Sequence, residues 1–151
     1  MHSLNLFVMD KVRDILQMKG NLIYTICITC TVYEALEVLE EKNLGALVVV
    51  DESGKLIGIF TERDYARKVV LKGRSSKETY VRDIMTDSPV FVSPDTDIEY
   101  CMQLMTNKFI RHLPVIENNE LTGIISIGDI VKHVISNKDF IIQHLEHYIV
   151  S

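Results

Sequence analysis

Apolar residues along the chain follow two patterns, short continuous runs and helical spacing. The run from Leu47 to Val50 is apolar at every position, which is typical of a strand covered on both faces. Before it, apolar residues follow Thr31 at helical spacing and stop at Gly45, so the pattern predicts a helix between them. Together with the neighbouring segments, these patterns predict the order strand, helix, strand, strand, helix for the first half of the chain. The strands are expected at 23–29, 47–50 and 56–60, and the second helix at 62–71.

The second half of the chain repeats this order of elements. Strands are expected at 90–92, 113–116 and 121–126, and helices ending at 108 and covering 129–135. Turn-forming residues, Ser93-Pro94-Asp95 and Asn118-Asn119, separate these segments. Residues 72–77 are polar, lack apolar periodicity and predict an exposed linker between the halves.

An internal repeat underlies this symmetry. The segment from Gly58 to Asp64 matches the one from Gly123 to Asp129 at an offset of 65 residues, and Val12-Arg13-Asp14-Ile15 matches Val81-Arg82-Asp83-Ile84 at an offset of 69. We therefore predict an α+β fold of two βαββα repeats, at 10–73 and 78–136, followed by an amphipathic helix at 137–151. One short sheet with two helices leaves an apolar face uncovered, so the repeats are expected to pack sheet to sheet about a pseudo-twofold axis and to form two related clefts.

Charge and composition restrict the partners. The chain of 151 residues has 16 Lys and Arg against 21 Asp and Glu, a formal net charge of −5. Nucleic-acid polymers and anionic membranes bind through an excess of Lys and Arg, so neither is expected as a partner. The apolar run at 46–50 is far shorter than the roughly 20 residues of a membrane span. An odd number of cysteines, three, favours a reducing compartment: the cytoplasm, or an organellar matrix if a presequence has been removed.

Two hydroxyl–carboxylate pairs mark the points where a strand turns into a helix. Thr61 stands three residues before Asp64, and Ser126 three residues before Asp129. One interpretation is purely structural, since this spacing is that of a capping box at a helix N-terminus. The other is a ligand site, because a preceding glycine permits close approach and the apolar pair beside it can floor a flat aromatic pocket.

The chain resembles the CBS domain in one duplicated pattern at the end of each βαββα unit. The pattern is a Gly, two apolar residues, a Ser or Thr, any two residues and an Asp. The resemblance covers about residues 11–136 and implies a tandem CBS pair, also called a Bateman module. Further segments similar to family motifs are Val12-Arg13-Asp14-Ile15, Val81-Arg82-Asp83-Ile84, Gly45 to Val50, Thr61 to Asp64, Arg111-His112-Leu113-Pro114-Val115 and Ser126 to Asp129. The resemblance implies an adenosine nucleotide ligand, first AMP and otherwise ADP, ATP, NAD or S-adenosylmethionine, and no required cofactor.

The same resemblance assigns roles to individual residues. Asp64 and Asp129 are expected to accept hydrogen bonds from ribose hydroxyls, with Thr61 and Ser126 near ribose or phosphate. Cations for the phosphate are Arg63 from one repeat and Arg111 with His112 from the other. Pro114, in the strand that follows Arg111 and His112, is also expected to contact the ligand. The adenine slots are expected to be lined by Ile23, Thr25, Ile59, Phe60, Pro89, Val90, Ile124 and Ile125.

The repeats differ at these positions, so the two clefts are expected to have unequal affinity. Arg63 aligns with Gly128, whereas Arg111 and His112 align with Gly45 and Ala46. The alternative for Arg63 is a solvated first-turn residue, and for Arg111 and His112 a structural pair before a buried strand.

The function predicted is therefore that of a regulatory module, not an enzyme. It is expected to form a homodimer and to act on a protein that the sequence does not identify. A ligand-free dimeric scaffold, in which the two carboxylates only cap helices, is the alternative from another class. A thiol redox protein using Cys27 and Cys30 is a minor one, because in a strand these side chains would point to opposite faces. No metal site is expected: His144 and His147 lack a third ligand.

Overall fold

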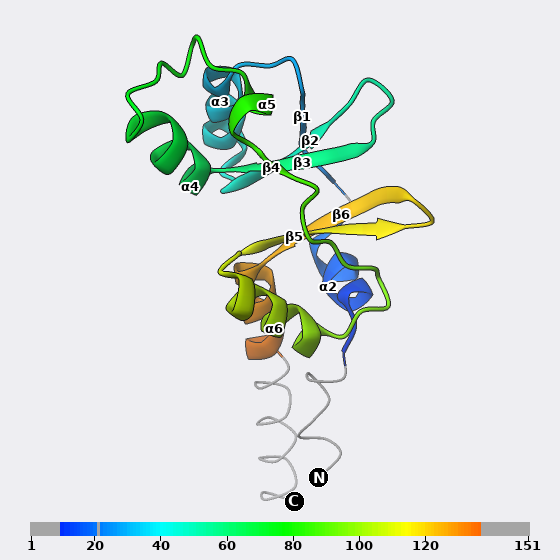
Figure 1. Ribbon diagram of the computed structural model, residues 1–151. Helices are drawn as coiled ribbons and strands as arrows, with labels where there is room; N and C mark the ends of the chain where they lie inside the picture. Colours follow the sequence, from blue (N-terminus) through cyan, green and yellow to red (C-terminus); the bar gives the residue numbers. More distant parts are fainter. Residues whose placement is uncertain (1–9, 21, 137–151) are drawn as a thin grey trace, which may run out of the picture. The chain divides into compact units, whose positions relative to one another are not determined.

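The computed structural model describes residues 10–20 and 22–136. These residues form two compact units: unit 1 combines the N-terminal segment up to Leu22 with the chain from Phe91 onward, and unit 2 is Ile23–Val90. The predicted helix at 137–151 lies outside the described residues. Each unit combines helices with a small sheet, which confirms the α+β class (Figure 1).

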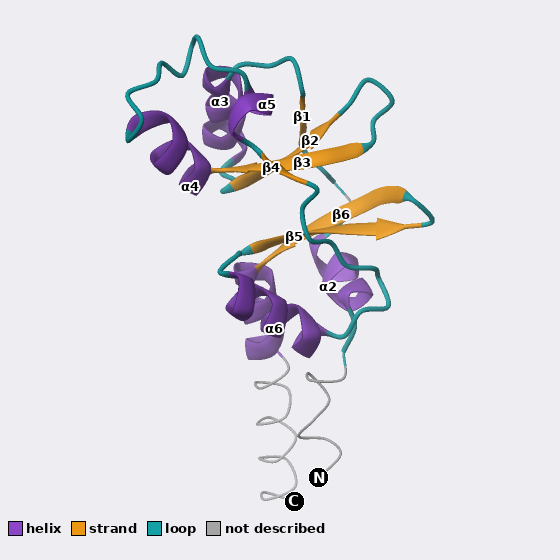
Figure 2. Ribbon diagram, in the orientation of Figure 1, coloured by secondary structure: helices purple, strands orange, loops and turns teal. Residues whose placement is uncertain are grey.

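Unit 2 is a four-stranded sheet in the order β1-β2-β3-β4, with its helices on one face (Figure 2). Strand β1 is parallel to β2, and the other two pairs are antiparallel. Strand β2 is buried at every position, which confirms the strand predicted from the continuous apolar run. Leu47 of β2 and Phe60 of β3 belong to the same core cluster. The strands are β1 Thr25–Cys27, β2 Ala46–Val50, β3 Leu56–Thr61 and β4 Thr86–Asp87. The helical elements are α3 Val32–Lys42, α4 Glu62–Asp64, the π-helical η2 Tyr65–Val70 and α5 Val81–Ile84.

Unit 1 contains an antiparallel hairpin packed with helices. Its elements are α2 Val12–Lys19, α6 Ile98–Lys108, β5 His112–Glu117, β6 Glu120–Ser126 and a helix over residues 127–136. The hairpin turns at Asn118 and Asn119, whose φ angles of 52° and 65° suit asparagine. The turn predicted there is confirmed.

Two predicted strands are shorter than expected. The strand predicted at 23–29 ends at Cys27, because the backbone N–H of Cys30 turns back to the Cys27 carbonyl at 3.1 Å. The strand predicted at 90–92 is reduced to a single bridge from Val92 to Val115. Pro89 has no N–H to donate, and the N–H of Ser93 is taken by Oγ1 of Thr96 at 3.0 Å, so a longer ladder cannot form.

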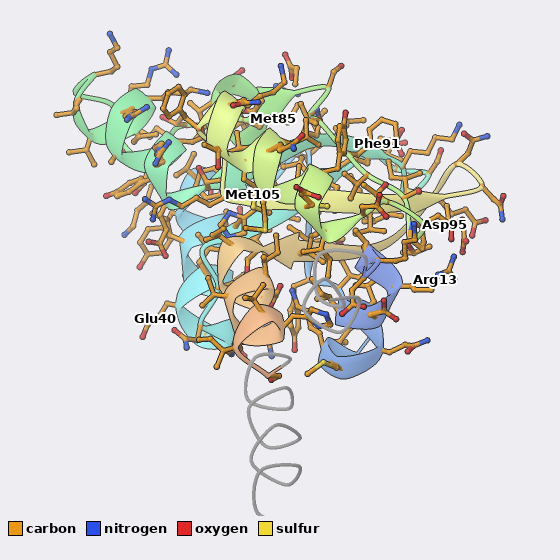
Figure 3. The ribbon with its side chains drawn as sticks, turned by 90° about the horizontal axis from the view of Figure 1, so that it is seen from below. Arg13, Glu40, Met85, Phe91, Asp95 and Met105 are labelled. Carbon is orange, nitrogen blue, oxygen red and sulfur yellow. The ribbon has the colours of Figure 1, made fainter. Side chains whose placement is uncertain are left out.

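The compact units are not the two sequence repeats, because the opening segments are exchanged. Helix α2, which opens the first repeat, packs with the second repeat's hairpin in unit 1. In the same way α5, which opens the second repeat, packs against β3 in unit 2. Both copies bury their Val and Ile: Val12 and Ile15 in one, Val81 and Ile84 in the other. In α2 the Asp14 carboxylate accepts the Lys11 N–H at 2.8 Å. Arg13 forms an ion pair with Asp95 (Figure 3).

Two glycines at equivalent repeat positions make room for these exchanged segments. A Cβ on Gly123 would lie 2.7 Å from Cδ2 of Leu16, which follows the opening motif of α2. A Cβ on Gly58 would lie 2.5 Å from Sδ of Met85, the residue equivalent to Leu16, and 2.9 Å from the carbonyl oxygen of Thr86. Each hairpin glycine thus receives the side chain from the equivalent position of an opening segment, Leu16 in unit 1 and Met85 in unit 2.

We expect Gly58→Ala to lower the free energy of unfolding by about 1–3 kcal/mol, the usual cost of overpacking. The matched variant Gly123→Ala is expected to cost less, because the Leu16 side chain can rotate away whereas the Thr86 carbonyl belongs to the β3–β4 ladder. Urea unfolding monitored by circular dichroism measures the free energy of unfolding of both variants. A larger loss for Gly123→Ala would contradict this account of the packing.

Candidate functional site

The first candidate pair forms a complete capping box where β3 passes into α4. The N–H of Asp64 donates to Oγ1 of Thr61 at 3.1 Å, and the N–H of Thr61 donates to Oδ2 of Asp64 at 3.0 Å. The Thr61 hydroxyl lies 3.1 Å from the same carboxylate oxygen, and Asp64 is buried. Thr61 and Asp64 therefore have a structural role before any ligand is considered.

The second pair repeats this geometry where β6 passes into the helix at 127–136. The N–H of Ser126 donates to Oδ2 of Asp129 at 2.8 Å, and the N–H of Asp129 donates to Oγ of Ser126 at 3.1 Å. The structural interpretation of both pairs is thus realised in the fold. It leaves the ligand interpretation open, because a carboxylate has several acceptor positions.

Each carboxylate also pairs with a lysine that was not among the predicted site residues. In unit 2, Nζ of Lys68 lies 3.1 Å from Oδ1 of Asp64 and donates to the Ile84 carbonyl at 2.9 Å. In unit 1, Nζ of Lys19 lies 2.7 Å from Oδ2 of Asp129 and donates to the Ile124 carbonyl at 2.7 Å. Lys68 follows Asp64 by four residues, a helical spacing that the sequence does signal. Lys19 comes from the exchanged helix α2, 110 residues from its partner, and nothing local signals it.

The two carboxylates differ in what they leave available. Asp64 uses Oδ2 for the cap and Oδ1 for Lys68. Asp129 uses Oδ2 for both the cap and Lys19, and within residues 10–20 and 22–136 no hydrogen bond reaches its Oδ1 atom. Asp129 therefore keeps an acceptor for an incoming hydroxyl group.

Lys19, Arg111 and Asp129 act electrostatically on His112, and these four residues are the charged cluster of unit 1. His112 is the cross-strand partner of Ser126 in the β5–β6 register, and it is half-buried. Burial lowers the pKa of His112 below its ordinary value of 6.5. Lys19 and Arg111 lower it further, and Asp129 opposes them. Besides His112, the cluster holds two permanent cations and one carboxylate, which leaves a positive excess. Because protonation of His112 is disfavoured in the folded state, its contribution to stability is present above about pH 6.5 and is lost as the pH falls through the folded pKa.

The equivalent position in unit 2 has no such cluster. Ala46 pairs with Thr61 just as His112 pairs with Ser126, so an apolar methyl group stands where unit 1 has an imidazole. The carbonyl of Gly45 accepts the Glu62 N–H, as the carbonyl of Arg111 accepts that of Ile127, which confirms the predicted alignment of the repeats. Arg63 is exposed in the first turn of α4.

The predicted adenine-lining residues are divided between the two units, with Ile124 and Ile125 in unit 1 and the others in unit 2. Phe60 and Ile125 are fully buried within their units and serve packing. Their neighbours Ile59 and Ile124 point to the opposite face, since side chains alternate along a strand. Pro114 is buried on β5, where it pairs with Ile124. Of the others, Thr25 is exposed on β1, and Ile23, Pro89 and Val90 are half-buried outside the strands.

Other features of the described residues lie away from these pairs. An open polar depression of about 600 Å³ in unit 2 is lined by Arg74, Glu78, Asp83 and their neighbours, with none of the predicted site residues. Within the described part of the chain, no three His, Cys, Asp or Glu side chains are grouped to hold a metal ion. His144 and His147 lie outside that part. No helix among the described residues is long and apolar enough to cross a membrane.

The cluster in unit 1 predicts opposite effects of two substitutions on the pKa of His112. Lys19→Met removes a nearby cation, so the pKa is expected to rise, whereas Asp129→Asn removes the opposing anion, so it is expected to fall. NMR titration of the imidazole measures both, and Lys132→Met, at an exposed position of the same unit, is the control. A shift of the same sign in both variants would refute the proposed cluster.

Comparison with known proteins agrees with the duplicated architecture. The sequence profile of the CBS domain matches residues 12–71 and 81–136. The chain is 42% identical over 151 residues to the mitochondrial CBS domain-containing protein CBSX3 of Arabidopsis thaliana, covering 95% of this chain and 73% of that protein. The structure of a CBS-domain protein from Burkholderia ambifaria MC40-6 superposes with a TM-score of 0.80 at 48% identity, covering 83% of this chain and 94% of that one.

A third match concerns assembly. The hexameric CBS-CP12 protein from bloom-forming cyanobacteria is 34% identical with a TM-score of 0.72, covering 80% of this chain and 70% of that one. Proteins with CBS domains are typically regulatory and non-catalytic, and the family is generally involved in ligand sensing. With both copies of the domain matched and the duplicated fold observed, the chain belongs to the CBS-domain family as a tandem CBS pair.

Proposed function

We propose that this chain is a regulatory module that binds an adenosine nucleotide, with AMP as the first candidate, and acts on a partner protein through a conformational change. The observation that carries the proposal is the Lys19–Asp129 ion pair at the start of a helix, together with His112, whose pKa is influenced by Lys19, Asp129 and Arg111. A nucleotide presents a vicinal diol and a phosphate, which need a carboxylate and cations close together. This cluster offers both.

The roles follow from the chemistry of each group. Oδ1 of Asp129 is the acceptor for a ribose hydroxyl, while Oδ2 keeps the helix cap. Lys19 and Arg111 are the cations for the phosphate, and the amides at the N-terminus of the helix add positive potential. A bound phosphate also favours the protonated form of His112, so binding is expected to strengthen as the pH falls.

The Asp64 position is the weaker of the two in this proposal. At Asp64 both carboxylate oxygens already have a partner, Lys68 at Oδ1 and the Thr61 cap at Oδ2, so a ribose hydroxyl has to share an oxygen with one of them. Ala46 supplies no charge where unit 1 has His112. Only Arg63 and Lys68 of unit 2 are then proposed as its cations, which supports unequal affinity for the nucleotide.

Regulation requires that the ligand favour one arrangement of the chain over another. A ligand shifts an equilibrium only by its difference in affinity for the two states. We place that difference at Lys19, because it ties the exchanged helix α2 to the candidate site through Asp129 and the Ile124 carbonyl. A ligand that draws Lys19 to its phosphate changes how α2 is held.

A ligand-free scaffold is the competing function, and the two complete capping boxes favour it. Thermal unfolding with AMP, ADP, ATP, NAD and S-adenosylmethionine separates the two hypotheses. At about one hundred times its dissociation constant a bound ligand adds about 2.7 kcal/mol to the free energy of unfolding. No shift with any of the five nucleotides would favour the scaffold.

A cation variant makes the test specific to the proposed phosphate site. Arg111→Met is expected to weaken AMP binding about 10-fold to 100-fold, the usual range for a charged hydrogen bond, and to leave adenosine binding unchanged. Isothermal titration calorimetry measures both ligands, with Lys132→Met as the matched control. Equal losses for AMP and adenosine would place the phosphate elsewhere.

Self-association is part of the proposal. Apolar side chains stand exposed on helices of both units, among them Val70 at 53% and Ile135 at 52% exposure, and the similar CBS-CP12 protein is hexameric. A homodimer buries such side chains at low cost. Light scattering at micromolar concentration is expected to give twice the monomer mass, and Val70→Asp to reduce it. A monomeric mass for the unmodified chain would overturn this part.

A reducing compartment is the proposed location. The described cysteines, Cys27, Cys30 and Cys101, are all free. The relative CBSX3 carries a mitochondrial designation in its name. Both observations support a reducing compartment, with an organellar matrix as one such location.

A further inference from the structure

Cys27 and Cys30 lie at the two ends of one tight turn. Strand β1 ends at Cys27, and the backbone N–H of Cys30 donates to the Cys27 carbonyl at 3.1 Å. A turn closed by this hydrogen bond holds its first and last Cα atoms within about 7 Å, the separation that a disulfide spans. The opposite orientation predicted from a strand over 23–29 does not apply, because the strand stops before Cys30.

The two thiols differ in accessibility. Cys27 is exposed, Cys30 is half-buried, and both are free. Burial raises the pKa of the Cys30 thiol. A backbone hydrogen bond involving Cys27 opposes that shift, whereas Glu34 and the Cys27 thiol add to it. Cys27 is thus the more accessible of the two thiols to reagents in solution.

We propose that Cys27 and Cys30 form a thiol–disulfide exchange site, which a small-molecule disulfide such as oxidised glutathione converts to an intramolecular disulfide. The Cys27 thiolate attacks one sulfur of oxidised glutathione, forming a mixed disulfide and releasing one glutathione thiolate. The Cys30 thiolate then attacks the Cys27 sulfur, closing the protein disulfide and releasing the second glutathione thiolate. The two protons lost by the cysteines are taken up by the two glutathione molecules.

The turn lies where a disulfide has structural consequences. It directly precedes Thr31, which caps α3 by accepting the Glu34 N–H at 3.2 Å. The Cys30 carbonyl also accepts the Val81 N–H of α5 at 2.9 Å. Closing the disulfide therefore fixes a turn to which β1, α3 and α5 are all attached. The exchange site does not depend on nucleotide binding.

Cys101 provides an internal control for chemical reactivity. It is fully buried, and burial raises the pKa of its thiol to about 11. A thiol that is both inaccessible and protonated reacts slowly with disulfides. Cys101 is expected to stay reduced under conditions that oxidise the pair.

The test uses the full chain, reduced and then incubated with oxidised glutathione. Free thiols are alkylated after unfolding, and the protein is digested with trypsin. The number of alkylated cysteines is expected to fall from three to one. Cleavage after Lys19 and Lys42 gives a peptide of residues 20–42 that contains both cysteines of the turn. That peptide is expected to lose two hydrogen atoms in mass, and dithiothreitol is expected to restore both alkylation sites.

Serine variants separate the two roles. Cys30→Ser is expected to stop at a glutathione adduct on Cys27, because the second thiol is missing. Cys27→Ser is expected to keep two alkylatable thiols, because its remaining turn cysteine is half-buried. Circular dichroism checks that both variants fold. Three reduced thiols in the unmodified chain, a lasting glutathione adduct on it, or a disulfide between two chains would each overturn the proposal.

Discussion

Both units depend on one kind of contact. In each, an exchanged opening segment packs onto a glycine of the hairpin. Leu16 lies on Gly123 in unit 1, and Met85 lies on Gly58 in unit 2, at equivalent positions of the duplicated sequence. Without these segments each hairpin would expose an apolar face. The exchange makes unit 1 from two distant stretches of chain, so unit 1 cannot form until residues more than 70 positions apart have met. The repeats are therefore coupled through chain connectivity.

The same exchange supplies the charge at the candidate site. Helix α2 ends at Lys19, whose ammonium group reaches the Asp129 carboxylate. In unit 2 the equivalent carboxylate instead takes a lysine from its own helical turn, Lys68. Two carboxylates with the same capping geometry thus differ in electrostatic surroundings. The difference gives a duplicated fold the means to bind ligands unequally, since affinity depends on the charges that surround the acceptor as well as on the acceptor itself.

Capping and ligand binding place compatible demands on the strand-to-helix junctions. The cap holds one oxygen of Asp129 and fixes the side chain in a single orientation, while the other oxygen stays available. A carboxylate oriented in advance loses little conformational entropy when a hydroxyl group binds to it. Structural and functional interpretations of the Ser126–Asp129 pair therefore describe two uses of one arrangement.

The sequence by itself determined the order of the elements, the duplication and the family. Continuous apolar runs, helical spacing and turn residues are local signals, and they predicted β2, α3 and the Asn118-Asn119 hairpin turn. The tertiary structure decided what depends on distant residues: the exchange of α2 and α5, the ion pair from Lys19 to Asp129, and the burial of Phe60 and Ile125. It also showed that Cys27 and Cys30 share a turn, since the end of β1 depends on its hydrogen bonds with β2. Local patterns record which residues are apolar, but partners across more than 100 residues are fixed only when the chain has packed.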